Sequence, residues 1–420
     1  MVARPEKAFE FPFFMAGTFI VFIVPQALSL IRFPGEISEP SIADILLMSL
    51  LCLTACFLGY YCGPKPFVAK KPAYRVNAGR LFHVGIFFIA TGYLFHWLLS
   101  RTEVQIADTG GMTGQGTILL FFEQLIFPGF AICLLLTLKE PGFWRVCACI
   151  AGLILPLQTV FAGRREPTVL LGVIILLGCF YARRTKPPRW LLPTIIAAAA
   201  VAIPATGTYR GLRARGEWTA IRRMDWLGNF KRFLSGESIL ELRNGAAIIE
   251  STKLTGSYEY GAGYWNHLVF RYIPAQILGK DFKDSLRIRN GWDIVETGVT
   301  ESGFELSRGS TITGMGDAFQ QFGWWGCIFF AFMGMFFQRL WPASLNPNGV
   351  FAQLLYMCSC TAAMRAVTHW TLDFLPGLVY NIIFIGAGML YASSPAIRAK
   401  RRKRPHELPI NASAPAPASR

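Results

Sequence analysis

The sequence predicts an all-α integral membrane protein with about ten transmembrane helices and one large extracytoplasmic loop. Hydrophobic residues make up 53% of the 420 residues and charged residues only 16%, a composition too apolar for a soluble chain of this length. About ten apolar segments approach the roughly 20 residues that a helix needs to cross a bilayer. A single polar stretch, from about Gly207 to Phe322, is long enough to fold outside the membrane. Any chemistry is therefore expected where this loop meets the helices.

The predicted spans fall into two groups on either side of the loop. Those before it cover residues 11–31, 42–61, 81–99, 117–138, 143–162, 167–182 and 190–205. Those after it cover 324–340, 350–367 and 375–392. The chain thus divides into a seven-span bundle (1–206), the loop (207–322), a three-span bundle (323–393) and a basic tail (394–420) whose Ala-Pro-rich end is predicted to be disordered.

The distribution of lysine and arginine predicts the orientation of the chain. These residues precede the first span and follow the second, fourth, sixth, eighth and tenth, in the loops that the positive-inside rule assigns to the cytoplasm. Both termini are therefore expected in the cytoplasm, and the large loop is expected outside. The same rule accounts for the net charge of +16 without a nucleic-acid partner, and the basic tail is expected to bind anionic membrane lipid.

Arg164 and Arg165 do not follow this rule, because they lie in a short turn, from Gly163 to Pro167, that the topology places outside. Cations there oppose the preferred orientation and need a compensating interaction. Two interpretations stay open. The arginines pair with Glu166 or with lipid phosphate, or they face an anion held at the outer surface.

A second departure lies at the outer end of the ninth span. Arg365, His369 and Asp373 follow one another at helical spacing and are predicted to share one helix face. Ionisable residues in a span usually face the bundle interior or a water-filled cavity, and Glu123 in the fourth span is a predicted internal partner. Alternatively, Arg365 extends to the lipid headgroups, and Glu123 forms a helix–helix salt bridge without a role in chemistry.

The large loop adds further candidates. Arg210 leaves the membrane directly after the seventh span, at the depth of a lipid phosphate, for which its planar guanidinium is suited. The segment from Trp265 to Pro274 is predicted to be an amphipathic helix on the membrane surface, with His267 and Arg271 on one face.

The sequence predicts neither a metal site nor a cofactor. Its five histidines are scattered, and its two Cys-x-Cys pairs lack neighbouring ligands at the spacing of a zinc site. All ten cysteines lie in or beside predicted spans, so we expect no disulfide-stapled outer domain.

The end of the loop resembles a known family. From Arg308 to Gly326 the chain reads RGSTITGMGDAFQQFGWWG, in which small residues are followed by Asp317, five positions before Phe-Gly-x-x-Gly at the mouth of a span. The glycines let the backbone approach a ligand closely, and Asp317 is predicted to begin a helix that leads into the membrane. Together with the many spans and the single late outer loop, this segment resembles the Wzy-type polysaccharide polymerases, in which glutamate is commoner at the acidic position.

The resemblance implies a membrane glycosyltransferase of GT-C-like architecture in the bacterial cytoplasmic (inner) membrane. Such enzymes join oligosaccharide repeat units, carried on undecaprenyl pyrophosphate, into a surface or secreted polysaccharide such as O antigen or exopolysaccharide. The transfer inverts the anomeric centre and uses no metal. The partners implied are the lipid-linked oligosaccharide, membrane lipid and a regulator of chain length.

Two chemical tasks follow from this resemblance. The departing pyrophosphate needs cationic donors, for which the candidates are Arg164, Arg165, Arg210, Arg271 and Arg365. The attacking hydroxyl must lose a proton to a base, for which the candidates are His267, His369 and Asp317. A ligase that transfers a finished glycan shares these features. A transporter or flippase for lipid-linked sugars is the alternative from another class, and the absence of an internal sequence repeat disfavours it.

Overall fold

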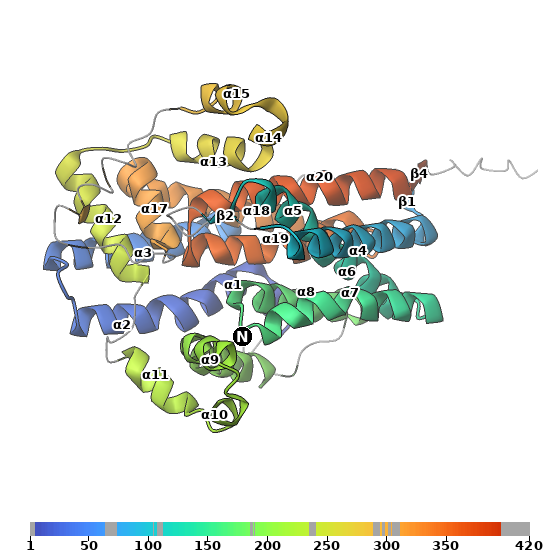
Figure 1. Ribbon diagram of the computed structural model, residues 1–420, viewed down its shortest axis with the longest axis horizontal. Helices are drawn as coiled ribbons and strands as arrows, with labels where there is room; N and C mark the ends of the chain where they lie inside the picture. The colour runs from blue at the N-terminus through green and yellow to red at the C-terminus, as the bar shows by residue number, and fades with distance from the viewer. Residues whose placement is uncertain are drawn as a thin grey trace, which may run out of the picture.

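The computed structural model describes residues 5–63, 74–103, 105–106, 112–184, 188, 190–234, 241–288, 295, 299–300, 304 and 311–395. These residues form a helical bundle with two short antiparallel ribbons (Figure 1). Nine helical segments among them are long and apolar enough to cross a membrane. The prediction of an all-α, multi-pass membrane protein is confirmed at this level. Arg308 and the basic tail lie outside the described residues.

The first part of the chain supplies seven of these nine segments. The first follows η1 (Pro5–Phe9) and consists of α1 (Phe11–Thr18), the π-helical turn η2 (Phe19–Ile23) and α2 (Val24–Arg32). Those that follow are α3 (Glu39–Cys62), α4 (Ala78–Ser100), α5 (Gln115–Glu123) with α6 (Ile126–Lys139), α7 (Phe143–Phe161), α8 (Arg165–Arg183) and α9 (Leu191–Ala214). Proline occupies the first turn of α1 and of α3, where its missing N–H leaves no helical bond unmade. Pro25 instead lies directly after the π-helical turn of the continuous first segment, where its missing N–H interrupts the helical hydrogen bonds.

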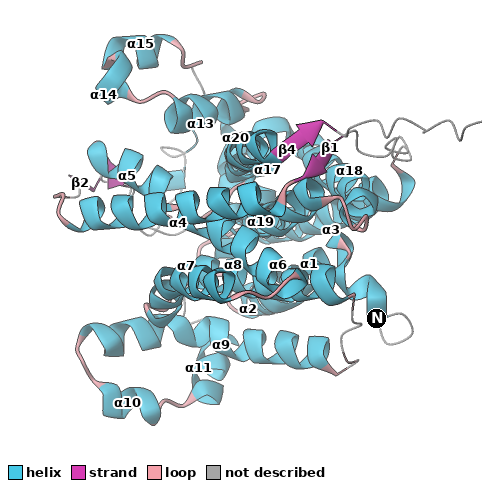
Figure 2. Cartoon of the chain, turned by 90° about the vertical axis from the view of Figure 1, so that its right-hand side faces the viewer, coloured by secondary structure: helices cyan, strands magenta, loops and turns pink. Residues whose placement is uncertain are grey.

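Helix α9 differs from its neighbours in direction. Figure 1 shows it end-on beneath the bundle, and Figure 2 shows it lengthwise. It packs against η2 and against two short helices of the loop, α10 (Trp218–Arg222) and α11 (Trp226–Leu234). The seventh predicted span is therefore a helix of sufficient length that crosses the direction of the other long helices.

The remaining loop helices lie on two other sides of the bundle. These are α12 (Glu241–Thr255), α13 (Ala262–Tyr272), α14 (Ala275–Leu278), α15 (Lys280–Ser285) and α17 (Thr313–Phe322). In Figure 1, α13, α14 and α15 form the upper flank, whereas α12 and α17 lie together against α3 at the left end. The α12–α17 pair is largely buried, so this part of the polar loop belongs to the core of the protein.

The C-terminal part contains η3 (Gly323–Gly326), α18 (Cys327–Ser344), α19 (Val350–Thr368), η4 (Thr371–Asp373) and α20 (Phe374–Ala392). Helices α19 and α20 belong to two of the nine apolar segments. The eighth predicted span coincides with α18, which is not among the nine and carries Gln338 and Arg339. The first turn of α18 adjoins α17, which in turn contacts the end of α19. The carbonyl of Ser344, the last residue of α18, accepts a hydrogen bond from Gln353 near the start of α19. Helix α18 therefore runs the full length of α19 in the opposite direction.

Small residues let α3 and α18 approach each other closely. A Cβ atom added to Gly59 would lie 2.1 Å from the carbonyl oxygen of Ala331, and one added to Gly334 would lie 2.2 Å from that of Cys56. Backbones in direct contact are typical of membrane helices, because dispersion rather than the hydrophobic effect drives their packing.

Several connections that were predicted to be cytoplasmic meet at one end of the bundle. Tyr356 at the start of α19 donates a hydrogen bond to the carbonyl of Phe9, and Tyr181 near the end of α8 donates one to Ser344, at 2.9 and 3.0 Å. The strand β1 (Tyr74–Val76), before α4, pairs with β4 (Ser393–Pro395), directly after α20. A second ribbon, β2 (Gln105–Ile106) with β3 (Met112–Thr113), lies between α4 and α5.

Candidate functional site

An apolar cavity of about 350 Å³ lies between four parts of the bundle. Its walls come from α1 with η2, from α8, from α9 and from α19, and include Phe13, Phe22, Val169, Leu176 and Ile196. Gly17 and Gly172 also line it and have no atom within 4 Å of the position that a Cβ would occupy. The cavity can therefore hold a slender apolar chain.

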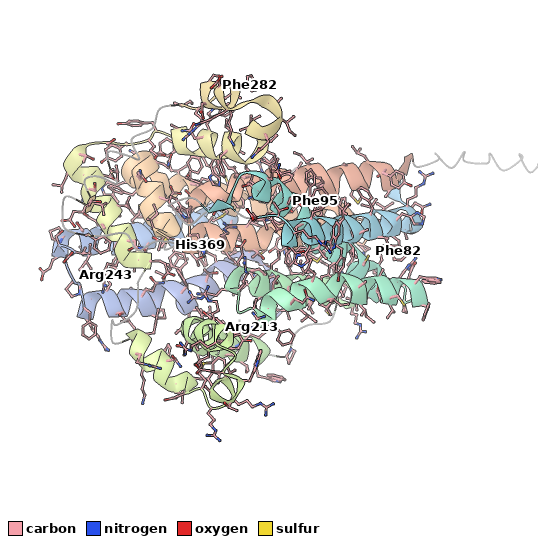
Figure 3. The ribbon with its side chains drawn as sticks, in the orientation of Figure 1. Phe82, Phe95, Arg213, Arg243, Phe282 and His369 are labelled. Carbon is pink, nitrogen blue, oxygen red and sulfur yellow. The ribbon has the colours of Figure 1, made fainter. Side chains whose placement is uncertain are left out.

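Charged and polar side chains close one part of this cavity. Arg165 and Glu166 come from the first turn of α8, whereas Arg365, Thr368 and His369 come from the end of α19. Figure 3 shows His369 well inside the bundle. An apolar space whose rim carries two guanidinium groups can hold an amphiphile with a long hydrocarbon chain and an anionic head that competes with the carboxylates for these groups.

Arg365 is the centre of a network of charged groups. Its Nη1 lies 2.9 Å from Glu166 Oε1, and its Nε lies 3.0 Å from Asp373 Oδ2. The second distance is that of an ion pair, although the Nε–H group makes no hydrogen bond of good geometry. The other oxygen of Asp373 lies 3.0 Å from Nε2 of His267, on α13 of the large loop. The network therefore joins the loop to α8, α19 and α20.

The predicted helical stacking of Arg365, His369 and Asp373 is wrong in one respect. Helix α19 ends at Thr368, and the backbone of His369 leaves the helical region, with φ −122° and ψ −88°. Asp373 reaches Arg365 because the chain turns back through η4. Glu123 is not a partner of this network: its carboxylate lies 3.0 Å from Nδ1 of His96 on α4, a contact between two helices of the kind that the alternative interpretation predicted.

Arg165 is held by groups that are distant in the sequence. Its Nε donates a 2.6 Å hydrogen bond to Thr206 on α9, and its Nη1 lies 3.8 Å from Glu241 at the start of α12. The side chain of Gln26 in turn donates to Glu241 and accepts from the backbone of Leu242. These contacts fix Arg165 at the edge of the cavity between α8 and α9.

The other predicted arginines lie outside the cavity lining. Arg164 precedes α8 and is exposed, and Arg210 on α9 is exposed beside Gly163. Arg271 on α13 donates a 2.7 Å hydrogen bond to Gln124 and stands over the ring of Phe121. The structure therefore brings only Arg165 and Arg365, of the five predicted anion ligands, to the same cavity.

The two candidate histidines occupy different environments. His369 lines the cavity, and Thr368 Oγ1 lies 2.8 Å from its Nδ1. Desolvation and the Arg365 guanidinium lower the pKa of His369, so it is neutral near pH 7. His267 lies at the loop side of the network and is oriented by Asp373, an arrangement in which a carboxylate aligns an imidazole base.

The third candidate base, Asp317, is buried in protein. Its side chain is 1% exposed, and it is not among the described residues that line the cavity. It does not begin a helix as predicted, because α17 starts at Thr313 and places Asp317 in its second turn. Desolvation raises the pKa of Asp317 to about 6, although hydrogen bonds from Thr371 and Leu372 oppose this shift.

Three features of the site were not apparent in the sequence. Glu241 and Gln26 support Arg165, and α9 forms a wall of the cavity. A carboxylate in a long polar loop gives no signal of its distant partner. The only signal in the sequence is the run of apolar residues 246–249, which predicts that this part of the loop is not fully solvated and which is buried in the structure.

No protein-family model, no curated protein and no solved structure matches this chain. Among the described residues, no three His, Cys, Asp or Glu side chains are grouped closely enough to hold a metal ion.

Proposed function

We propose that the protein is a membrane glycosyltransferase that polymerises polyprenyl-pyrophosphate-linked oligosaccharide repeat units at the outer face of the bacterial cytoplasmic membrane. The observation that carries this proposal is the apolar cavity with Arg165 and Arg365 at its rim. The cavity fits part of an isoprenoid chain, and the two guanidinium groups fit the pyrophosphate. Guanidinium forks bind phosphate oxygens through paired, charge-assisted hydrogen bonds.

The transfer step needs charge stabilisation and one base. The hydroxyl oxygen of the acceptor sugar attacks the anomeric carbon of the donor, and the bond from that carbon to the pyrophosphate oxygen breaks with inversion. Arg365 and Arg165 stabilise the negative charge that develops on the pyrophosphate. His267 accepts the hydroxyl proton, and Asp373 balances the imidazolium that forms. His369, which is neutral and lines the cavity, is the alternative base.

The test is to delete the protein from its host and to measure glycan size together with the pool of lipid-linked repeat units. We expect long polymer to disappear while single repeat units still reach the outer leaflet. Repeat units trapped inside would identify a flippase instead. Long polymer that persists on the lipid carrier would identify a ligase.

Complementation with Arg365→Ala tests the site. We expect a loss of polymerisation of about 100-fold or more, the usual effect of removing one charged donor from a transition state. Arg145→Ala is the matched control, because it also removes an arginine that lies 2.9 Å from a glutamate, Glu140, but in the first turn of α7 and away from the cavity. Full activity of the Arg365→Ala protein at normal abundance would refute the site assignment.

A further inference from the structure

A buried carboxylate holds the turn that carries Asp373. Oδ2 of Asp317 accepts hydrogen bonds from the hydroxyl of Thr371 and from the backbone N–H of Leu372, the latter at 3.2 Å. Thr371 Oγ1 lies 2.8 Å from the hydroxyl of Tyr264, so Tyr264 donates while Thr371 donates to Asp317. The N–H groups of a helix's first turn have no partner within the helix, and Asp317 satisfies one of them from another element.

The glycine-rich segment before Asp317 brings it to this turn. A Cβ atom on Gly314 would lie 1.7 Å from the carbonyl oxygen of Ala366, so α17 contacts the backbone of α19 directly. Thr311 adds a 3.2 Å hydrogen bond to the carbonyl of Thr368. Thr313 has φ +59°, an unfavourable conformation for a β-branched residue, at the first position of α17. Gly314 thus serves contact between helices.

The turn is where the network of the candidate site is assembled. Asp373, two residues after Thr371, contacts both His267 and Arg365. A shift of about 1 Å in this carboxylate would disturb the alignment of the base and of the arginine together, and such shifts far from the chemistry can cost about 100-fold in rate.

We infer that Asp317 is a positioning residue, whose carboxylate clamps Thr371 and Leu372 and thereby fixes Asp373 between His267 and Arg365. Neither Thr371 nor Leu372 is among the described residues that line the cavity, so Asp317 acts on the site through this turn. The effect on catalysis rests on the proposed function, whereas the effect on the turn does not.

The structural arm of the test is hydrogen exchange of the segment 369–375 in the intact protein. In Asp317→Asn, which replaces the carboxylate that accepts from Thr371 and Leu372 by an uncharged amide, we expect exchange of the Leu372 amide to become about tenfold faster, the change expected for a loss of about 1.4 kcal/mol. Thr371→Ser keeps the hydroxyl and should preserve protection. Ser344→Ala, which removes a buried hydroxyl at the other end of the bundle, should also preserve it. Unchanged protection in Asp317→Asn overturns the inference.

The catalytic arm is a double-mutant cycle in a polymerisation assay. Asp317→Asn should lower kcat about tenfold and leave KM within about twofold, and the double variant with Asp373→Asn should be no worse than Asp373→Asn alone. Multiplicative losses would show that Asp317 does not act through Asp373. If Asp317→Asn does not fold, Thr371→Val removes the same bond and replaces it in the cycle. A wild-type protein without polymerase activity would refute the proposed function, and the exchange result would still decide the inference.

Discussion

Arg365 keeps its charge inside an apolar bundle because carboxylates on two other segments balance it. Glu166 and Asp373 both lie within 3.0 Å of its guanidinium, and Asp373 is shared with His267. A buried charge that loses its partner is strongly destabilising, so these groups must be arranged together. The sequence correctly placed Arg365 and Asp373 near each other, but it could not reveal Glu166 as a partner from another helix.

A second buried acidic group gives a prediction at the residue scale. Desolvation raises the pKa of Glu259 from 4.5 to about 7, and Asp317 adds to the shift, although a hydrogen bond from Gln321 opposes it. The folded state therefore binds a proton more tightly than the unfolded chain. This contribution to stability is present below pH 4.5 and is lost as the pH rises through 7.

We expect Glu259→Gln to reduce this pH dependence. The wild-type protein should lose on the order of 3 kcal/mol of unfolding free energy, relative to the variant, as the pH rises from about 4.5 to above 7. The measurement is the thermal unfolding temperature of both proteins in detergent across that range. Some slope should remain in the variant, because the pKa of Asp317 is shifted in the same direction. Parallel pH profiles for the two proteins would contradict the prediction.

At the scale of elements, the lengths of the apolar segments predicted where most helices lie, but they did not predict where a helix is interrupted within such a segment. The segment predicted over 117–138 is two helices, α5 and α6, and Gln124 at the break reaches Arg271 on α13. The predicted amphipathic helix from Trp265 to Pro274 is present as α13, Ala262–Tyr272, where Ile273 follows and Pro274 prevents its continuation. A break within an apolar segment changes no composition, so periodicity and hydropathy do not reveal it.

The cavity between α1, α8, α9 and α19 gives a prediction at this scale. Gly172→Leu adds four carbon atoms to its wall, and the first of them, the Cβ, has no atom within 4 Å. We expect at least about a tenfold lower apparent affinity for a long-chain polyprenyl substrate, and a smaller loss for a short-chain analogue that does not fill the cavity.

The measurement is the initial rate against substrate concentration in liposomes for both chain lengths. Gly386→Leu is the matched control, since Gly386 on α20 is equally free of close atoms but does not line this cavity. Equal losses for both chain lengths, or for both variants, would argue against a chain in the cavity.

At the scale of the whole molecule, the connections that are rich in arginine and lysine meet at one end of the helical bundle. The charged network around Arg365 lies toward the opposite end. The β1–β4 pairing joins the predicted cytoplasmic connection before α4 to the end of α20. Helix α18 runs from one end of the bundle to the other, because it contacts both the start and the end of α19. The arrangement of helices thus matches the ten predicted spans only if both α18 and α9 cross the membrane.

Cysteine labelling tests this topology. Cys62, the last residue of α3, and Cys147, near the start of α7, are exposed at helix ends that the charge rule assigns to the cytoplasm, whereas Leu254 on α12 is exposed on the large loop. In single-cysteine variants, a membrane-impermeant maleimide should label Leu254→Cys in intact spheroplasts. It should reach Cys62 and Cys147 only after permeabilisation. Labelling of Cys62 from outside would reverse the orientation.

The sequence by itself determined the membrane fold and the positions of most spans. It also singled out Arg164, Arg165 and Arg365 as cations at positions that neither the positive-inside rule nor the apolar character of a span predicts. These properties depend on local composition, which each segment carries alone. The tertiary structure decided which of the predicted residues share a site. It selected Arg165 and Arg365, separated Arg271 from them, and buried Asp317 beneath a turn. The physical reason is that ion pairs and cavities form between helices far apart in the chain, and helix packing alone sets those distances.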